Sequence, residues 1–114
     1  RQKNVFLVVA RDTDVSSSIF DIFSSVIIGK ASLHITMLDD STKKATVEQV
    51  VVDTAYRGRG IADLIDDELY KIAKQNGVAY IDLTSNPSRV AANKFYLRRG
   101  YERRETNVYR KIVS

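Results

Sequence analysis

The segment from Glu48 to Ala62 places an apolar strand directly before a loop that is rich in glycine and arginine. Three consecutive valines, Val50 to Val52, are typical of a buried strand, and Gly58 and Gly60 follow within a few residues. Apolar residues beyond the loop recur with a helical period and predict one face of a helix: Ile61, Leu64, Ile65, Leu69 and Ile72. We therefore expect a strand–loop–helix unit in which the helix packs on a sheet.

The loop at the start of this helix is a candidate phosphate site. The first backbone amides of a helix have no partner within the helix, and they lie at the positive end of its dipole. Gly58 and Gly60 allow backbone conformations that other residues avoid, and they let the main chain approach a ligand closely. Together these features predict a site for phosphate or pyrophosphate.

Spacing separates three kinds of phosphate-binding loop. A P-loop needs Lys and Ser or Thr directly after its second glycine, whereas Ile61 and Ala62 follow Gly60 here. A dinucleotide-binding loop needs a third glycine where this chain has Asp63. The remaining pattern, Arg57-x-x-Gly60-x-Ala62, resembles the acetyl-CoA pyrophosphate loop of the GNAT superfamily of N-acetyltransferases. An ordinary glycine-rich turn is the structural alternative.

A second segment strengthens the resemblance. Residues 78–84 predict another strand, and Gly100 ends the helix that follows it. The run from Ala91 to Tyr101 is similar to the second GNAT signature, A-x-x-[FL]-Y-x-x-x-G-[FY]. The resemblance extends over residues 26–113, and it lacks the strand and two helices that usually precede this core in the family. The chain is therefore expected to be a short member of the family, a fragment, or one whose gap a partner subunit fills.

The resemblance implies that acetyl-CoA binds as a co-substrate and that no metal takes part. Main-chain groups of the valine strand would pair with the pantetheine arm, which slots between this strand and the strand ending at Thr84. The loop amides would hold the pyrophosphate. The residues concerned are Val50, Val51, Val52, Arg57, Gly58, Arg59, Gly60, Ile61 and Ala62. Asn93 on the second helix is a further candidate contact with the cofactor, and Arg57 and Arg59 could equally face solvent.

The chemistry implied by the resemblance is direct attack of an amine on the thioester in a ternary complex. Tyr96 stands at the family's tyrosine that protonates the CoA sulfur; its alternative role is core packing. Glu48 lies where many members carry a carboxylate that deprotonates the amine, often through water. Its alternatives are exposure to solvent or a pair with an arginine. His34, the sole histidine, is a rival base, although the alternating pattern of its strand predicts a surface position.

The expected fold class is α/β (α+β), with a mixed, mostly antiparallel sheet and helices packed on it. The expected order is β-β-β-α-β-α-β-β, within a single domain of residues 1–114. Val5 to Ala10 is a continuous apolar run, and we expect this strand to be buried on both faces. Residues 11–24 are a connection rich in Ser and Asp, and Gly29 predicts a bulge in the second strand. The other strands are expected at 26–38, 45–53, 78–84, 101–104 and 107–113.

Composition limits the class of protein further. The chain has 114 residues, of which 44% are hydrophobic, and this suits a single core. It contains no cysteine, which excludes disulfides and thiolate zinc sites. No apolar run reaches the ~20 residues of a membrane helix, and no leader is visible at the start. Because the chain has no cysteine, a reducing cytoplasm is the expected default compartment.

The net charge of +4 raises a nucleic-acid surface as one alternative. The basic residues of the C-terminal third are interleaved with Glu102 and Glu105, and no aromatic stacking motif accompanies them. A solvated face is therefore favoured. We expect an N-acetyltransferase that acts on a primary amine; a non-catalytic acyl-CoA-binding module and an interaction domain on the same fold are the alternatives. Because the family's first helices are missing, uncovered apolar surface predicts a homodimer.

Overall fold

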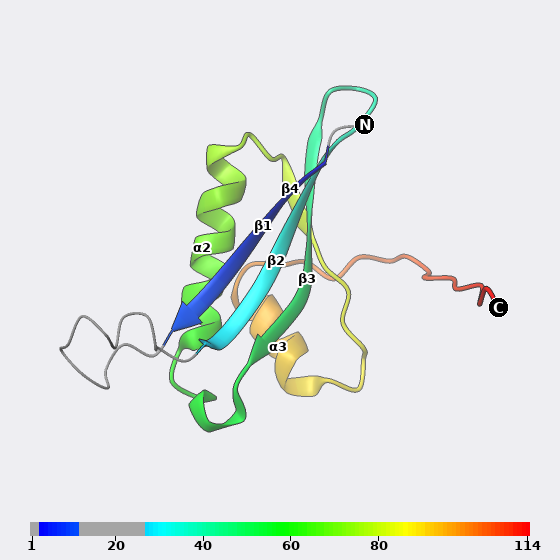
Figure 1. Ribbon diagram of the computed structural model, residues 1–114. Coiled ribbons are helices and arrows are strands. Elements are labelled where there is room, and N and C mark those ends of the chain that lie inside the picture. Colours follow the sequence, from blue (N-terminus) through cyan, green and yellow to red (C-terminus); the bar gives the residue numbers. More distant parts are fainter. Residues whose placement is uncertain (1–2, 12–26) are drawn as a thin grey trace. The chain divides into compact units, whose positions relative to one another are not determined.

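The computed structural model describes residues 3–11 and 27–114 (Figure 1). The chain forms two compact units, which divide between Thr84 and Ser85. The connection that the sequence predicts at 11–24 lies, after Arg11, outside the described residues.

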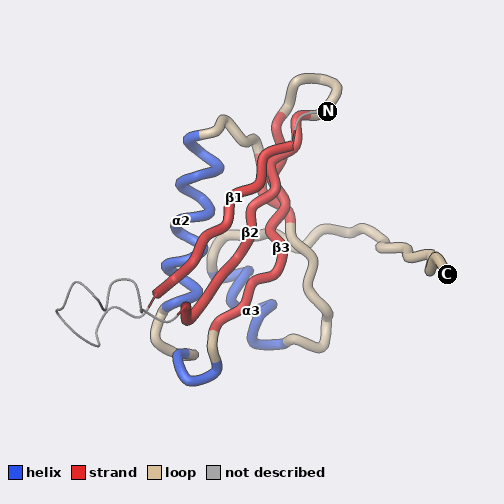
Figure 2. Tube along the Cα trace, viewed as in Figure 1, coloured by secondary structure: helices blue, strands red, loops and turns tan. Residues whose placement is uncertain are grey.

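A four-stranded sheet forms the first unit. Its strands are β1 (Lys3–Arg11), β2 (Ile27–Met37), β3 (Lys43–Val52) and β4 (Tyr80–Asp82), in the order β1-β2-β3-β4. The first three are antiparallel to one another, and β4 runs parallel to β3. Figure 2 shows the three long strands side by side, with a turn joining β2 to β3 at one end. The sequence therefore predicted these strands correctly, although β4 is shorter than the expected 78–84.

The turn between β2 and β3 is held by a side chain. The Thr42 N–H donates to Asp40 Oδ1 at 2.9 Å, and this hydrogen bond lowers the pKa of the Asp40 carboxyl. Ser41 takes a left-handed conformation with φ of 69°, and the Leu38 N–H donates to the Thr42 carbonyl at 2.7 Å. Hydrogen bonds within the turn thus stabilise the antiparallel hairpin of β2 and β3.

Helix α2 (Ile61–Gln75) covers one face of the sheet (Figure 1). Its buried apolar side chains, Ile65, Leu69 and Ala73, follow helical steps of four and pack against the inward-facing residues of the strands. Leu64 was expected on this face and is instead exposed, because it lies at the edge of that stripe. The core gathers where α2 meets the sheet; its buried members are Val8, Ala31, Leu33, Ile35, Ala45, Val47, Ile65, Leu69 and Ala73.

Gly29 lets α2 approach β2 closely. A Cβ atom at this position would lie 2.9 Å from Ile65 Cδ1 and 3.2 Å from Ile61 Cγ2, both of which belong to α2. The pairing of β1 with β2 also shifts here, since Ala10 pairs with Gly29 and Arg11 pairs with Ile27. The predicted irregularity at Gly29 is confirmed.

Strand β1 is buried on one face only. Phe6 and Ala10 pack against the core, whereas Val5 and Leu7 are 56% and 67% exposed. The expectation that this strand is buried on both faces is wrong, because α2 covers a single face of the sheet. A continuous apolar run does not by itself distinguish the two cases.

Helix α3 (Val90–Arg98) is the regular element of the second unit. Gly100 follows it with φ of 94°, its N–H donates to the Leu97 carbonyl at 3.2 Å, and the Tyr101 N–H donates to the Tyr96 carbonyl at 3.0 Å. This pair of bonds is a Schellman motif, which only a left-handed residue completes. The predicted helix end at Gly100 is therefore confirmed.

The two C-terminal strands expected at 101–104 and 107–113 are absent from the structure, which assigns no strand to residues 101–114. Their apolar side chains are strongly exposed, from 77% for Val108 to 93% for Val113. A two-stranded ribbon on its own is marginal in water, so apolar residues in this segment do not by themselves form strands.

The longest described helix is α2, and no helix in the described ranges is both long and apolar enough to span a membrane.

Candidate functional site

The loop from β3 to α2 is built by local hydrogen bonds. Asp53 follows β3, and its Oδ1 accepts the Ala55 N–H at 2.9 Å, which starts the single turn η1 (Thr54–Tyr56). The Arg59 guanidinium lies 5.1 Å from the centre of the Tyr56 ring, so this arginine stacks on the turn. Figure 2 shows the turn between the end of β3 and the start of α2.

Gly58 and Gly60 both take left-handed conformations, with φ of 79° and 77°. The space around each is open, so the backbone angle rather than crowding favours glycine. Gly60 is the N-cap of α2 and supplies no side-chain hydrogen bond to the helix. The first amides of α2 are thus left for another acceptor, and an anion is the acceptor that a helix start favours.

Strand β3 contains a bulge just before this loop. Glu48 pairs with Ser32, but Val51 pairs with Lys30, so β3 holds one residue more than β2 over this stretch. Gln49 has φ of 56°, which identifies it as the extra residue. The bulge shifts the side-chain alternation by one position, and it bends the end of the strand.

Strands β3 and β4 separate after a short pairing. Their register ends where Thr46 pairs with Asp82, while β3 continues to Val52. On the β4 side, the described strands leave the last six residues of β3 without a ladder partner. A backbone edge of this kind can pair with an extended ligand that carries amide groups. After Val52 the chain continues through η1 into the glycine loop.

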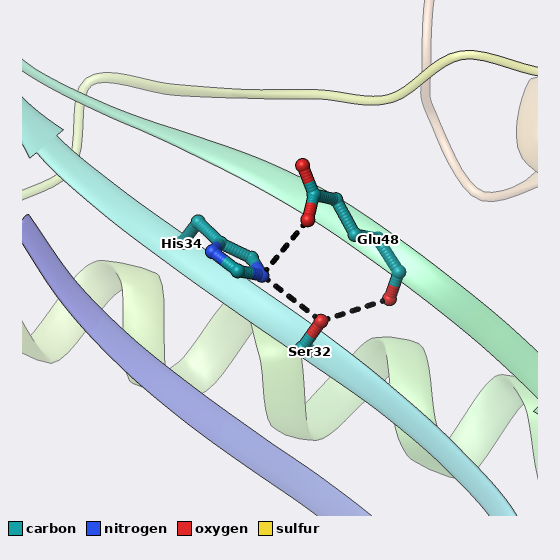
Figure 3. Close-up of polar contacts among 3 residues, drawn as sticks. All are labelled: Ser32, His34 and Glu48. Atoms are coloured by element: carbon teal, nitrogen blue, oxygen red, sulfur yellow. Dashed lines mark hydrogen bonds and ion pairs between the residues drawn. The ribbon is translucent and has the colours of Figure 1, made fainter. Parts of the chain in front are cut away.

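A polar cluster of Ser32, His34 and Glu48 lies on the sheet face opposite α2 (Figure 3). Ser32 Oγ donates to the Glu48 carbonyl oxygen at 3.1 Å and lies 3.1 Å from His34 Nε2. His34 Nε2 in turn lies 3.1 Å from Glu48 Oε2, and the side chains of His34 and Glu48 are 17% and 53% exposed. His34 Nδ1 is buried without a hydrogen-bond partner.

The expectation of a surface His34 is wrong, and the arginine partner considered for Glu48 is replaced by this histidine. The sequence did contain a signal for the cluster, which is the Ser32-x-His34 alternation on one strand face. The partner on β3 depends on the hairpin register, which the turn and the bulge fix together.

Tyr96 lies in the second unit on α3. Its ring meets those of Phe95 and Tyr101 edge to face, at centroid distances of 5.5 and 5.6 Å. The Schellman motif holds Tyr101 against Tyr96, so the Gly-Tyr end of the signature fixes the motif tyrosine. Asn93 donates through Nδ2 to the Asn86 carbonyl at 3.0 Å, which ties α3 to the turn before it.

The structure thus gathers the predicted strand, loop and carboxylate in the first unit and the predicted Tyr96 and Asn93 in the second. Over residues 3–11 and 27–114, no cluster of three or more His, Cys, Asp or Glu side chains could hold a metal ion.

The sequence matches a family model described as the Acetyltransferase (GNAT) family over residues 3–101. A curated relative, the L-2,4-diaminobutyric acid acetyltransferase of Streptomyces coelicolor, is 32% identical over 75 residues. That match covers 65% of this chain and 44% of the relative, so the chain spans less than half of the relative's length.

Solved structures share the fold. An acetyltransferase of Trypanosoma brucei superposes with a TM-score of 0.70 at 21% identity, over 96% of this chain and 100% of that one. An aminoglycoside N-acetyltransferase in complex with CoA, AAC(6')-Iy, superposes with a TM-score of 0.67 at 22% identity, over 77% of this chain and 69% of that one.

Proposed function

Because this chain belongs to the GNAT family of acetyltransferases, we propose that it transfers the acetyl group of acetyl-CoA to a primary amine. The observation that carries the proposal is the end of β3, where an open backbone edge leads into a glycine loop and a helix start without a side-chain cap. These are the groups that a pantetheine arm and a pyrophosphate need.

Acetyl-CoA fits this end of the first unit by its chemistry. The pantetheine arm carries two amides, and the main chain of Val50, Val51 and Val52 would pair with them as an added strand would. The pyrophosphate would accept hydrogen bonds from the amides of the loop from Arg57 to Ala62. Arg59 is stacked on Tyr56, which keeps a positive charge on the loop. Asn93 remains a candidate contact through its oxygen, because the described hydrogen bond uses its nitrogen.

The reaction then needs proton transfers at both the acceptor nitrogen and the departing sulfur. Glu48 accepts a proton from the acceptor ammonium, directly or through a water molecule, and the free amine attacks the thioester carbonyl. The new C–N bond forms and the C–S bond breaks. Tyr96 gives its proton to the departing sulfur, and the nitrogen releases its second proton as it becomes an amide, which restores the Tyr96 hydroxyl. The half-exposed carboxylate of Glu48 supports its role, since a base must reach its substrate. In this scheme the chain needs no covalent intermediate and no metal.

The acceptor is a primary amine of a small molecule or a protein. The names of the similar proteins point to amino acids and aminoglycosides as first acceptors to test. We propose L-2,4-diaminobutyrate, neamine, spermidine, glucosamine 6-phosphate and a lysine peptide as the panel.

Two measurements test the proposal. Calorimetry with acetyl-CoA should show binding. Desulfo-CoA contains the pyrophosphate and should keep the affinity that this group provides, whereas adenosine lacks the pyrophosphate and should lose that affinity. Release of free CoA thiol with the amine panel should show turnover. Binding without turnover on any amine would favour a non-catalytic acyl-CoA-binding module, and absence of binding would overturn the proposal.

A further inference from the structure

We propose that His34 is a positioning residue that holds the Glu48 carboxylate, with Ser32 setting the direction of the hydrogen bonds, and that His34 is not itself the base. The inference rests on the proposed function for the role of Glu48, but the arrangement of the three side chains can be tested without any acceptor. It decides between the two candidate bases that the sequence left open.

The hydrogen-bond directions follow from Ser32. Its hydroxyl has one hydrogen, and this hydrogen is donated to the Glu48 carbonyl oxygen. Toward His34 the same oxygen can therefore only accept, so the hydrogen between Ser32 Oγ and His34 Nε2 belongs to the ring. His34 is then the Nε2–H tautomer, and that hydrogen is shared with Glu48 Oε2 on the other side.

The other ring nitrogen has no partner that could hold a second hydrogen. Nε2 already carries a hydrogen, and Nδ1 is buried without a partner. A second ring proton would lie on Nδ1, where a buried N–H would face no acceptor. A proton taken from an amine would thus have no favourable place on the ring.

The contact with His34 fixes one carboxylate oxygen of Glu48 and leaves the other oxygen available to a substrate. Oε2 is held by His34, whereas Figure 3 shows the second oxygen directed away from the ring. A half-exposed glutamate without such a partner samples several rotamers, and a base must be aligned with the proton it takes. The contact therefore restricts the carboxylate to one orientation.

The first test is the tautomer of the sole histidine, measured by ¹⁵N NMR of the labelled chain. The expected result is a ring hydrogen on Nε2, and a changed Nε2 signal in Glu48→Gln and in Ser32→Ala. A ring with its hydrogen on Nδ1, or a signal that neither variant alters, would overturn the inference.

The second test compares two replacements of His34 on the best amine of the panel. Glutamine can donate from nearly the same place as Nε2, whereas leucine cannot. We expect His34→Leu to lower kcat by about 10²-fold with acetyl-CoA affinity and melting temperature unchanged, and His34→Gln to recover most of that loss. Equal loss in both variants would identify the imidazole itself as the base.

A double variant separates this inference from the proposed function. In a Glu48→Gln background, His34→Leu should cause little further loss, because the two side chains act as a unit. If acetyl-CoA binding or turnover fails altogether, the proposed function fails, while the NMR result still decides the arrangement of His34.

Discussion

At Tyr96 a single hydroxyl distinguishes a catalytic role from a packing role. The ring is held edge to face by Phe95 and Tyr101, so Tyr96→Phe should keep the packing of α3. If the hydroxyl protonates the departing thiolate, kcat should fall by roughly 10²–10⁴-fold while acetyl-CoA affinity stays the same. Steady-state kinetics and calorimetry on one preparation measure both quantities.

Tyr101→Phe is the matched control for this variant. It removes a hydroxyl from the neighbouring ring of the same aromatic contact, and it should leave kcat close to that of the unaltered chain. A fully active Tyr96→Phe protein would remove Tyr96 from the mechanism and leave it as a packing residue.

For a test of Gly60 in the loop, Gly77, which follows the end of α2, provides a matched control. Both are left-handed, with φ of 77° and 70°, and both have open space around them. Valine at either position should destabilise the fold by about 1–2 kcal/mol, because of the backbone angle alone. Only Gly60→Val should also lower acetyl-CoA affinity, since Gly60 lies where the pyrophosphate would bind.

Calorimetry and thermal melting of both variants measure these two effects. Equal affinity in the Gly60→Val and Gly77→Val proteins would mean that the loop does not hold the pyrophosphate.

At the residue scale, the sequence predicted those functional residues whose contacts are with residues close in the chain. Gly60, Gly100 and Tyr96 were predicted because a local motif surrounds each of them. His34 was misjudged, because its partner Glu48 is brought to it by the hairpin register rather than by proximity in sequence. The roles of these side chains stay predictions until the variants are measured.

At the element scale, the contact between α2 and β2 depends on the missing side chain of Gly29. Gly29→Ala would place a Cβ 2.9 Å from Ile65 Cδ1, so this side chain must shift. We expect a loss of roughly 1–3 kcal/mol in the free energy of unfolding, which denaturant titration measures.

Ile65→Val provides the control through a double-variant cycle. It removes the Cδ1 atom that clashes, and alone it should cost about 0.5–1.5 kcal/mol. In combination with Gly29→Ala the two losses should be less than additive. Strict additivity would show that the crowding at Gly29 has another source.

The elements that the sequence predicted well are those with their own start and stop signals. Both helices end at a glycine, Gly77 and Gly100, and both ends are Schellman motifs. The strands predicted at 101–104 and 107–113 have no such signals, and the structure shows no strand there. A strand needs a neighbouring strand, and which strand pairs with it depends on residues elsewhere in the chain.

For the whole molecule, we predict a homodimer from the apolar side chains exposed on the sheet face opposite α2. Val5 and Leu7 are exposed on it, and apolar surface of this kind tends to be covered by association. If a homodimer forms there, light scattering should give twice the mass of the chain, and Leu7→Lys should shift the mass toward that of the monomer.

Leu64→Lys is the control for this assembly, because Leu64 is similarly exposed at 63% but lies on α2. It should leave the mass unchanged. A strict monomer at high concentration, or an equal response of both lysine variants, would contradict a dimer through this face.

The bulge at Gln49 is not required by the apolar core. Ala45 and Val47 before it and Val50 and Val52 after it all pack on the α2 side, so a strand one residue shorter would keep the same alternation. The left-handed residue costs roughly 1–2 kcal/mol that such a strand would save. Deletion of Gln49 should therefore yield a protein whose melting temperature is no lower. The same deletion should weaken acetyl-CoA binding, because it removes the bend at the end of β3. Heat resistance and ligand binding would then favour different lengths of the same strand.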